Sequence, residues 1–224
     1  MFNLSFDIFA KNYHKKKSQI LSKEFIADLE TPISAFLKLS PNQEYSFLLE
    51  SVEGGDQRGR YSLLGINPDI IWQCKNNKVI IHGKNKETIN NLNHNLSPIS
   101  SLRELLKISF IKRDKNLSPY PSLVGYMGYP MIKYMEKIKL NNPDNINIPN
   151  SIFIRPKLVA VFDNIKDKII LMSPIYYSKN VKAEIEYKRS KNEINKAISI
   201  LKSRLSKKKK INLKNNIIRP KSNL

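Results

Sequence analysis

The chain has 224 residues, of which 39 are Lys or Arg and 19 are Asp or Glu, so its formal net charge is +20 at pH 7. Hydrophobic residues make up 41%, close to the globular average, and the length suffices for one large or two small domains. No apolar run approaches the about 18 residues of a membrane helix, and the N-terminal charges follow the apolar stretch, unlike those of a secretory signal. The single Cys74 excludes an internal disulfide, and the histidines lack metal-ligand spacing. We therefore expect a cytoplasmic protein that binds no membrane.

The surplus of positive charge is concentrated near the C-terminus. Residues 179–224 include 15 basic and 3 acidic residues, among them the run Lys207–Lys210. Such a run can neutralise phosphates as a flexible arm, but a solvated basic linker is its commoner meaning. Because no nucleic-acid recognition motif or aromatic stacking pattern accompanies it, we expect no specific nucleic-acid partner.

Helix and strand patterns alternate along the first half of the chain. Thr31 and Pro32 begin a short helix, Thr as the N-cap and Pro in the first turn. The apolar runs Phe47–Val52 and Tyr61–Gly65 flank a turn with two glycines and predict a hairpin, since glycine tolerates the positive φ of such a turn. A second hairpin, with Trp72 half-buried in its first strand, is predicted across two asparagines: Ile70–Cys74 and Val79–His82.

The second half contains two further helices and a third hairpin. Ser101–Glu104 has the form of a capping box that opens a helix through about Ser109. The runs Leu158–Phe162 and Ile169–Met172 predict a hairpin. Apolar residues at helical spacing predict an amphipathic helix over about Lys182–Ser206.

These elements predict an α+β fold. Hairpins with intervening helices are typical of a mainly antiparallel sheet, or sheets, with flanking helices. We expect one domain over residues 1–206, because the helical periodicity is lost after that point. Residues 207–224 are then a basic linker.

Glu50 and Ser51 are the unusual residues of the first hairpin. They place a charge and a hydroxyl inside a predicted strand, where polar groups need hydrogen-bond partners or a ligand. One interpretation is a binding site. The alternative is a strand in which Glu50 points to water and Ser51 bonds to a backbone group.

Four segments, in order, resemble motifs of anthranilate synthase component I, the large subunit of a chorismate-using enzyme. The family motifs are D-x-E-T-P-x-S-A-F-L-K-L, L-L-E-S, V-G-Y-x-G-Y and R-P-x-x-x-x-F-D. The matching segments here are Asp28–Leu39, Leu48–Ser51, Val124–Tyr129 and Arg155–Asp163. The third motif departs from the family, with Pro121-Ser122 where Gly-Gly is usual and Pro130 where Asp often follows. Proline fixes φ and removes a donor, so these changes reshape that loop.

The resemblance implies the fold and function of the N-terminal half only. It implies two orthogonal sheets with helices around them, in a protein about twice this length. The full reaction uses chorismate and ammonia, supplied by a glutamine amidotransferase subunit, and yields anthranilate and pyruvate in tryptophan biosynthesis. Magnesium and chorismate residues belong to the later half, so we expect this chain to bind no cofactor, to contain no catalytic residue and to be inactive alone.

The resemblance also implies a site for L-tryptophan as feedback inhibitor. In the family, L-L-E-S contributes to that site, which implies a role for Ser51. The Glu50 carboxylate suits an ammonium group, and Leu49 borders the pair. Weaker candidates face them across the hairpin: Arg60, Tyr61 and Ser62. Two alternatives remain, the N-terminal portion of aminodeoxychorismate synthase component I of the folate pathway and a standalone tryptophan-binding module.

Overall fold

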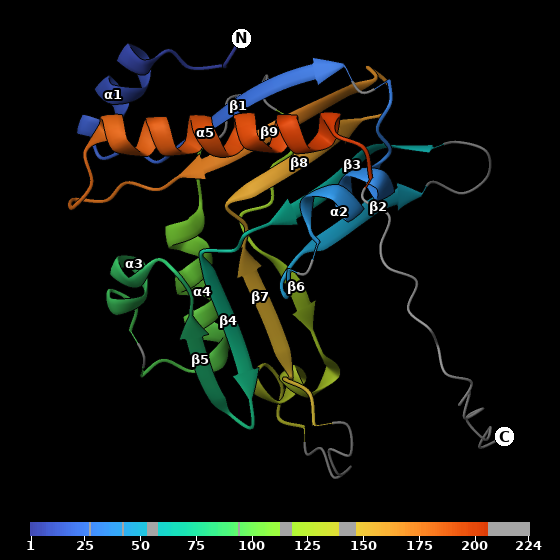
Figure 1. Ribbon diagram of the computed structural model, residues 1–224. Coiled ribbons are helices and arrows are strands. Elements are labelled where there is room, and N and C mark those ends of the chain that lie inside the picture. Colours follow the sequence, from blue (N-terminus) through green and yellow to red (C-terminus); the bar gives the residue numbers. More distant parts are fainter. Residues whose placement is uncertain are drawn as a thin grey trace, which may run out of the picture.

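Two antiparallel sheets form the framework of the computed structural model, which describes residues 1–26, 28–41, 43–52, 58–93, 95–112, 118–138 and 147–205 (Figure 1). The strands of the five-stranded sheet are, in spatial order, β1 (Gln19–Ile26), β9 (Lys168–Ile175), β8 (Leu158–Asp163), β3 (Arg58–Ile66) and β2 (Phe47–Val52). Those of the four-stranded sheet are β5 (Lys78–His82), β4 (Ile70–Lys75), β7 (Ser151–Arg155) and β6 (Val124–Met127). The predicted α+β class with antiparallel sheets and flanking helices is confirmed.

Three helices cover one face of the five-stranded sheet: α1 (Phe6–His14), α2 (Pro32–Leu39) and α5 (Ala183–Lys202). Figure 1 shows the long α5 lying along this face. Ile194 and Leu201 of α5 pack with Leu21 and Leu171 of the sheet in one buried cluster. The opposite face of β8 and β9 buries a second set of side chains, including Val161 and Met172. The central strands are therefore buried on both sides, which explains their continuous apolar runs.

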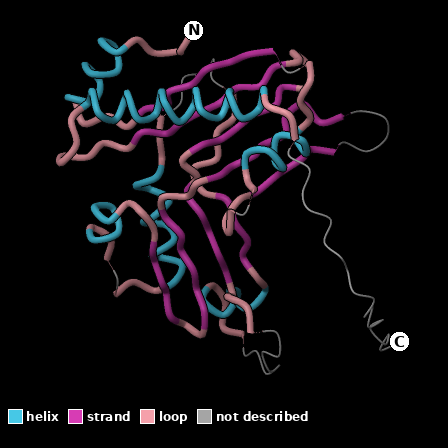
Figure 2. The backbone as a smooth tube through the Cα atoms, viewed as in Figure 1, coloured by secondary structure: helices cyan, strands magenta, loops and turns pink. Residues whose placement is uncertain are grey.

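The four-stranded sheet has its own core beneath two helices, α3 (Lys86–Asn90) and α4 (Pro98–Ser109) (Figure 2). Trp72 lies at the centre of this core and is completely buried, so the prediction that it is half-buried was wrong. Its indole Nε1 donates a hydrogen bond to Ser101 Oγ over 3.0 Å. Without this bond, the buried indole N–H would have no hydrogen-bond partner.

The start of α4 also differs from the prediction. The helix begins one turn earlier than the Ser101–Glu104 pattern indicates, with Ser97 as the N-cap and Pro98 in the first turn. Ser97 Oγ accepts from the Ser100 backbone N–H, so a Ser-Pro start supplies both the cap and a preset φ. Ser101 is therefore a core residue of the helix and not its cap.

The predicted hairpins agree with the structure in the described residues. Asn76 and Asn77 join β4 to β5 with φ of 48° and 67°, the left-handed conformation of a tight hairpin turn. The amphipathic helix begins at Ala183 and ends at Lys202, slightly inside its predicted bounds. The glycine turn at 53–57 and the predicted linker at 207–224 lie outside the described residues, so the domain boundary stays a prediction. No helix in the described part of the chain combines the length and apolar character needed to cross a membrane.

In the described residues, the chain passes directly from a strand of one sheet to a strand of the other in two connections, which lie side by side and are together called the joint. β3 leads into β4 through Asn67–Asp69, and β7 leads into β8 through Pro156 and Lys157. Asp69 accepts two hydrogen bonds from Arg155, from Nε over 2.7 Å and from Nη2 over 2.8 Å. Both residues are buried, and Arg155 ends β7 while Asp69 precedes its partner strand β4, so this paired contact holds the two connections together at the end of the four-stranded sheet.

Candidate functional site

The polar pair singled out in the sequence lies on β2, the outer strand of the five-stranded sheet. Glu50 and Ser51 are exposed, and Leu49 is 47% exposed. Within the described residues no strand pairs with the outer edge of β2. A ligand or another segment can therefore reach the backbone and side chains of this strand.

The strand register shows which predicted site residues meet. Glu50 pairs with Ser62 on β3, and Leu49 pairs with Leu63. The pairing shifts between Glu50 and Val52, so Ser51 lies at an irregularity of the β-bulge type.

The side chain of Ser51 fits only beside a glycine. A Cβ on Gly59 would lie 2.2 Å from Ser51 Oγ, far inside contact distance. Gly59 therefore allows the serine side chain to lie over the neighbouring strand. This position explains why the hairpin needs a glycine at the start of β3.

The two faces of the hairpin divide the candidate residues. Leu48 packs against the core beneath α2 and α5, and alternation places Glu50 and its neighbour Ser62 on that same face. Leu49 lies on the other face with Leu63, and Tyr61 packs there with the second core cluster. Glu50 and Ser62 thus lie next to each other on one face of the hairpin, and Leu49 and Tyr61 lie on the other face.

Arg60 has a partner that the sequence interpretation missed. Its guanidinium pairs with Asp163 at the end of β8, with 3.1 Å between Nη2 and Oδ2. Burial would raise the pKa of Asp163, but hydrogen bonds from Arg60 and from two backbone N–H groups of the following turn hold it below its usual value. Arg60 therefore stabilises the β3–β8 pair, which leaves it a weaker candidate for ligand binding. In the sequence, Asp163 stood out only as the last residue of the fourth motif, which does not indicate its partner.

The first motif has a structural role in the described geometry. Thr31 caps α2 in a reciprocal capping box with Ser34. Lys38 pairs with Glu30 and also donates a hydrogen bond over 2.7 Å to the backbone oxygen of Leu201, at the end of α5. The motif therefore attaches α2 to α5, behind the strand that carries Glu50.

Within the described residues, no group of three His, Cys, Asp or Glu side chains could hold a metal ion. The described part of the chain thus offers no donor set that fits Mg²⁺, and no chemical step is assigned to the ion here. A cleft of about 470 Å³ does exist, but it lies between α3 and α5, and none of the predicted site residues lines it.

Comparison with known proteins gives a consistent result. No family model matches the chain. Anthranilate synthase component 1 of Cereibacter sphaeroides is 34% identical over 198 residues, which is 87% of this chain and 39% of that protein. The same enzyme component from Thermus thermophilus is 35% identical over 153 residues, covering 68% of this chain and 31% of that protein. The Aquifex aeolicus protein of the same name is 32% identical over 185 residues, covering 82% and 36%.

One solved structure, anthranilate synthase component I from Streptococcus pneumoniae TIGR4, has a TM-score of 0.47 and 22% sequence identity to this chain. It covers 80% of this chain, which in turn spans 37% of that protein. The chain spans between 31% and 39% of the three curated relatives named above. The resemblance predicted from four motifs is confirmed: over most of its length, this chain matches the N-terminal region of anthranilate synthase component 1.

Proposed function

We propose that this chain is the N-terminal part of an anthranilate synthase large subunit and contributes part of its L-tryptophan feedback site. The observation that carries the proposal is the match to the Cereibacter sphaeroides protein over 87% of the chain. The same relatives favour anthranilate synthase over aminodeoxychorismate synthase. In the complete enzyme, chorismate and ammonia from a glutamine amidotransferase subunit would give anthranilate and pyruvate, with Mg²⁺ held outside the described residues.

The chemistry of the β2 edge supports an inhibitor site. Tryptophan is a zwitterion, so its ammonium needs an acceptor and its carboxylate needs donors. The exposed Glu50 supplies the acceptor, and the Ser51 hydroxyl, held over Gly59, supplies a donor at the irregularity. Leu49 lies on the opposite face of the strand from Glu50, so the indole wall comes from Leu49 only if the ligand reaches around the open edge.

The test uses a full-length large subunit, rebuilt by fusing this chain to the C-terminal part of the Cereibacter sphaeroides relative. Ser51→Ala and Glu50→Ala are each compared with wild type for inhibition by tryptophan. Loss of one charge-assisted contact costs about 1.5 to 3 kcal/mol, so inhibition should weaken by roughly ten- to a hundredfold while uninhibited turnover is kept.

Glu24→Ala is the matched control, because Glu24 is an exposed carboxylate on β1, the opposite outer strand of the same sheet. Its inhibition should equal that of wild type. Wild-type inhibition in both the Ser51 and Glu50 variants would show that the polar pair is ordinary strand surface. Tight tryptophan binding by the 224-residue chain alone that is lost in Ser51→Ala would favour the standalone binding module instead.

A further inference from the structure

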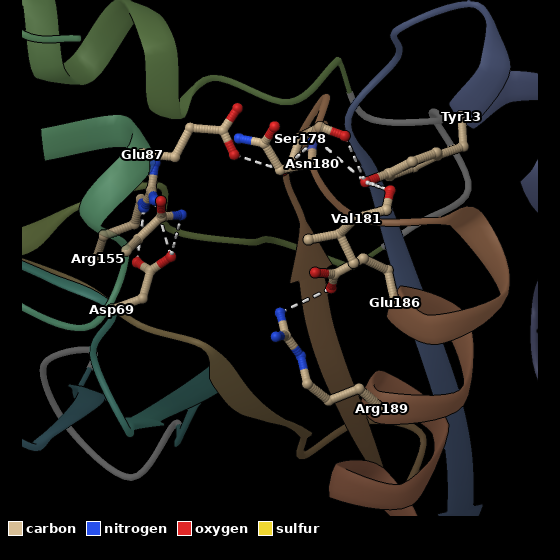
Figure 3. Close-up of polar contacts among 10 residues, drawn as sticks. Tyr13, Asp69, Glu87, Arg155, Ser178, Asn180, Val181, Glu186 and Arg189 are labelled. Carbon is tan, nitrogen blue, oxygen red and sulfur yellow. Dashed lines mark hydrogen bonds and ion pairs between the residues drawn. The ribbon is translucent and has the colours of Figure 1, made fainter. Parts of the chain in front are cut away.

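The cleft of about 470 Å³ lies beside the joint between the two sheets. Its wall is built from α3, the first half of α5, both connections between the sheets, and the segment that follows β9. Figure 3 shows Asp69 and Arg155 on one side and the α5 residues Glu186 and Arg189 on the other. The volume falls within the roughly 300 to 1,000 Å³ of small-molecule sites.

Of the eight charged residues that line the cleft, four have partners and two, Lys84 and Lys86, are exposed to water. Asp69 is held by Arg155, and Glu186 accepts a hydrogen bond from Arg189 over 2.7 Å. Glu87 accepts a hydrogen bond from the Ser178 hydroxyl. These contacts, drawn in Figure 3, form the wall and leave no demand for a ligand.

Lys157 and Glu193 are the charged residues of the cleft that are largely buried and have no direct partner within the described residues. Within the described residues the Lys157 ammonium forms no hydrogen bond and no ion pair, although it is largely buried and lines the cleft. Glu193 Oε2 is also buried without a hydrogen-bond partner in the described structure. Burial lowers the pKa of Lys157 and raises that of Glu193. The opposite charge of each residue opposes the pKa shift of the other, so the two attract each other across the cleft without forming a direct ion pair.

We propose that this cleft binds a small zwitterion, an α-amino acid, with its carboxylate against Lys157 and its ammonium against Glu193. Both charges line one cleft, and a bound group of each opposite sign satisfies both. A simple anion would pair with Lys157 and leave Glu193 without a partner, and a simple cation would do the reverse. An apolar ligand would leave both charges unpaired. Each of these ligands would therefore leave at least one buried charge without a partner, which is costly. This site shares no residue with the β2 edge and goes beyond the inhibitor site proposed there.

The twenty protein amino acids are screened individually against the 224-residue chain by thermal shift, and binding is measured by calorimetry. We expect at least one of them to raise the Tm. Lys157→Met and Glu193→Gln should each weaken its binding by roughly ten- to a hundredfold, because each removes one charge-assisted contact. Ligand-free melting of each variant separates lost binding from a lost fold, and Lys157→Arg, which keeps the charge, should bind more tightly than Lys157→Met.

Two exposed α5 residues outside the cleft provide matched controls, Lys196→Met and Glu184→Gln, and both should bind like wild type. Ser51→Ala should also bind like wild type, so failure of the β2-edge proposal and failure of this one are distinguishable. The proposal is overturned if no amino acid binds, if both cleft variants bind like wild type, if Ser51→Ala abolishes binding, or if acetate alone binds as tightly as the amino acid.

Discussion

Asp69 and Arg155 stand at the two places where the chain passes from one sheet to the other, and each is almost fully buried. Besides the paired contact, the Arg155 guanidinium lies 3.9 Å from the centre of the Tyr176 ring. Asn85 Nδ2 donates to Asp69 Oδ2 over 3.3 Å. The ion pair is thus enclosed by hydrogen-bonding and aromatic groups that compensate for the lost water.

Removing one member of this pair should cost far more than removing both. Arg155→Leu leaves the Asp69 carboxylate buried and uncompensated, which costs about 3 to 5 kcal/mol, whereas Asp69→Leu combined with Arg155→Leu removes the unpaired charge. Urea denaturation of both variants measures the two free energies of unfolding. A single variant that loses less than about 1 kcal/mol would show that the pair does not hold the joint.

At the scale of elements, sequence patterns predicted the hairpins and helices that depend on interactions between residues close together in the chain. The Asn76-Asn77 turn and the alternating runs beside it predicted β4 and β5 because a tight hairpin depends on a few neighbouring residues. β1 was not predicted. It pairs with β9, about 150 residues later in the chain, so no adjacent turn indicates its partner. The contacts of Arg60 with Asp163 and of Asp69 with Arg155 were missed for the same reason, as they join residues 103 and 86 positions apart.

The residues of the candidate site could likewise be identified from the sequence, but not all of their positions relative to one another. A polar pair in a strand identified Glu50 and Ser51, and the structure places them on an open edge. Alternation separates Leu49 from Glu50 and Ser62, but the position of Ser51 against β3 depends on the irregularity after Glu50. Periodicity alone does not locate such a shift, in which the single residue Ser51 of β2 stands opposite three residues of β3.

The attachment of α2 to α5 can be tested by one substitution. The Lys38 side chain is only 9% exposed and binds both Glu30 and the Leu201 carbonyl. Lys38→Met therefore removes the ammonium from the Glu30 carboxylate, which within the described residues keeps only its hydrogen bond from Ser34, and leaves the helix-end carbonyl without this donor. We expect a loss of about 1.5 to 3 kcal/mol in stability and faster hydrogen exchange in the last turn of α5.

Lys202→Met is the control, since Lys202 is exposed in that same last turn. Its exchange rates should stay close to those of wild type. Equal rates in the Lys38 and Lys202 variants would mean that the first motif does not hold the end of α5.

At the scale of the whole molecule, two sheets with separate cores are connected by two neighbouring passages of the chain. Within the described residues, no strand pairs with the outer edges of β2, β5 and β6. The matched relatives are much longer, so this region is 39% or less of each of the three named. The described residues supply a framework, an exposed polar edge and a cleft, but no metal-binding cluster. Under the proposed function, the chemistry of chorismate therefore depends on the part of the large subunit that this chain does not span.

Turnover should accordingly require that missing part. The 224-residue chain, assayed with chorismate, Mg²⁺ and ammonium, should produce no anthranilate fluorescence, whereas the fusion to the C-terminal part of the Cereibacter sphaeroides relative should. The C-terminal part alone is the control, because activity there would show that this chain is dispensable for the reaction. Turnover by the 224-residue chain approaching the typical enzyme rate of about 10 per second would contradict the prediction and place the chorismate site within this chain.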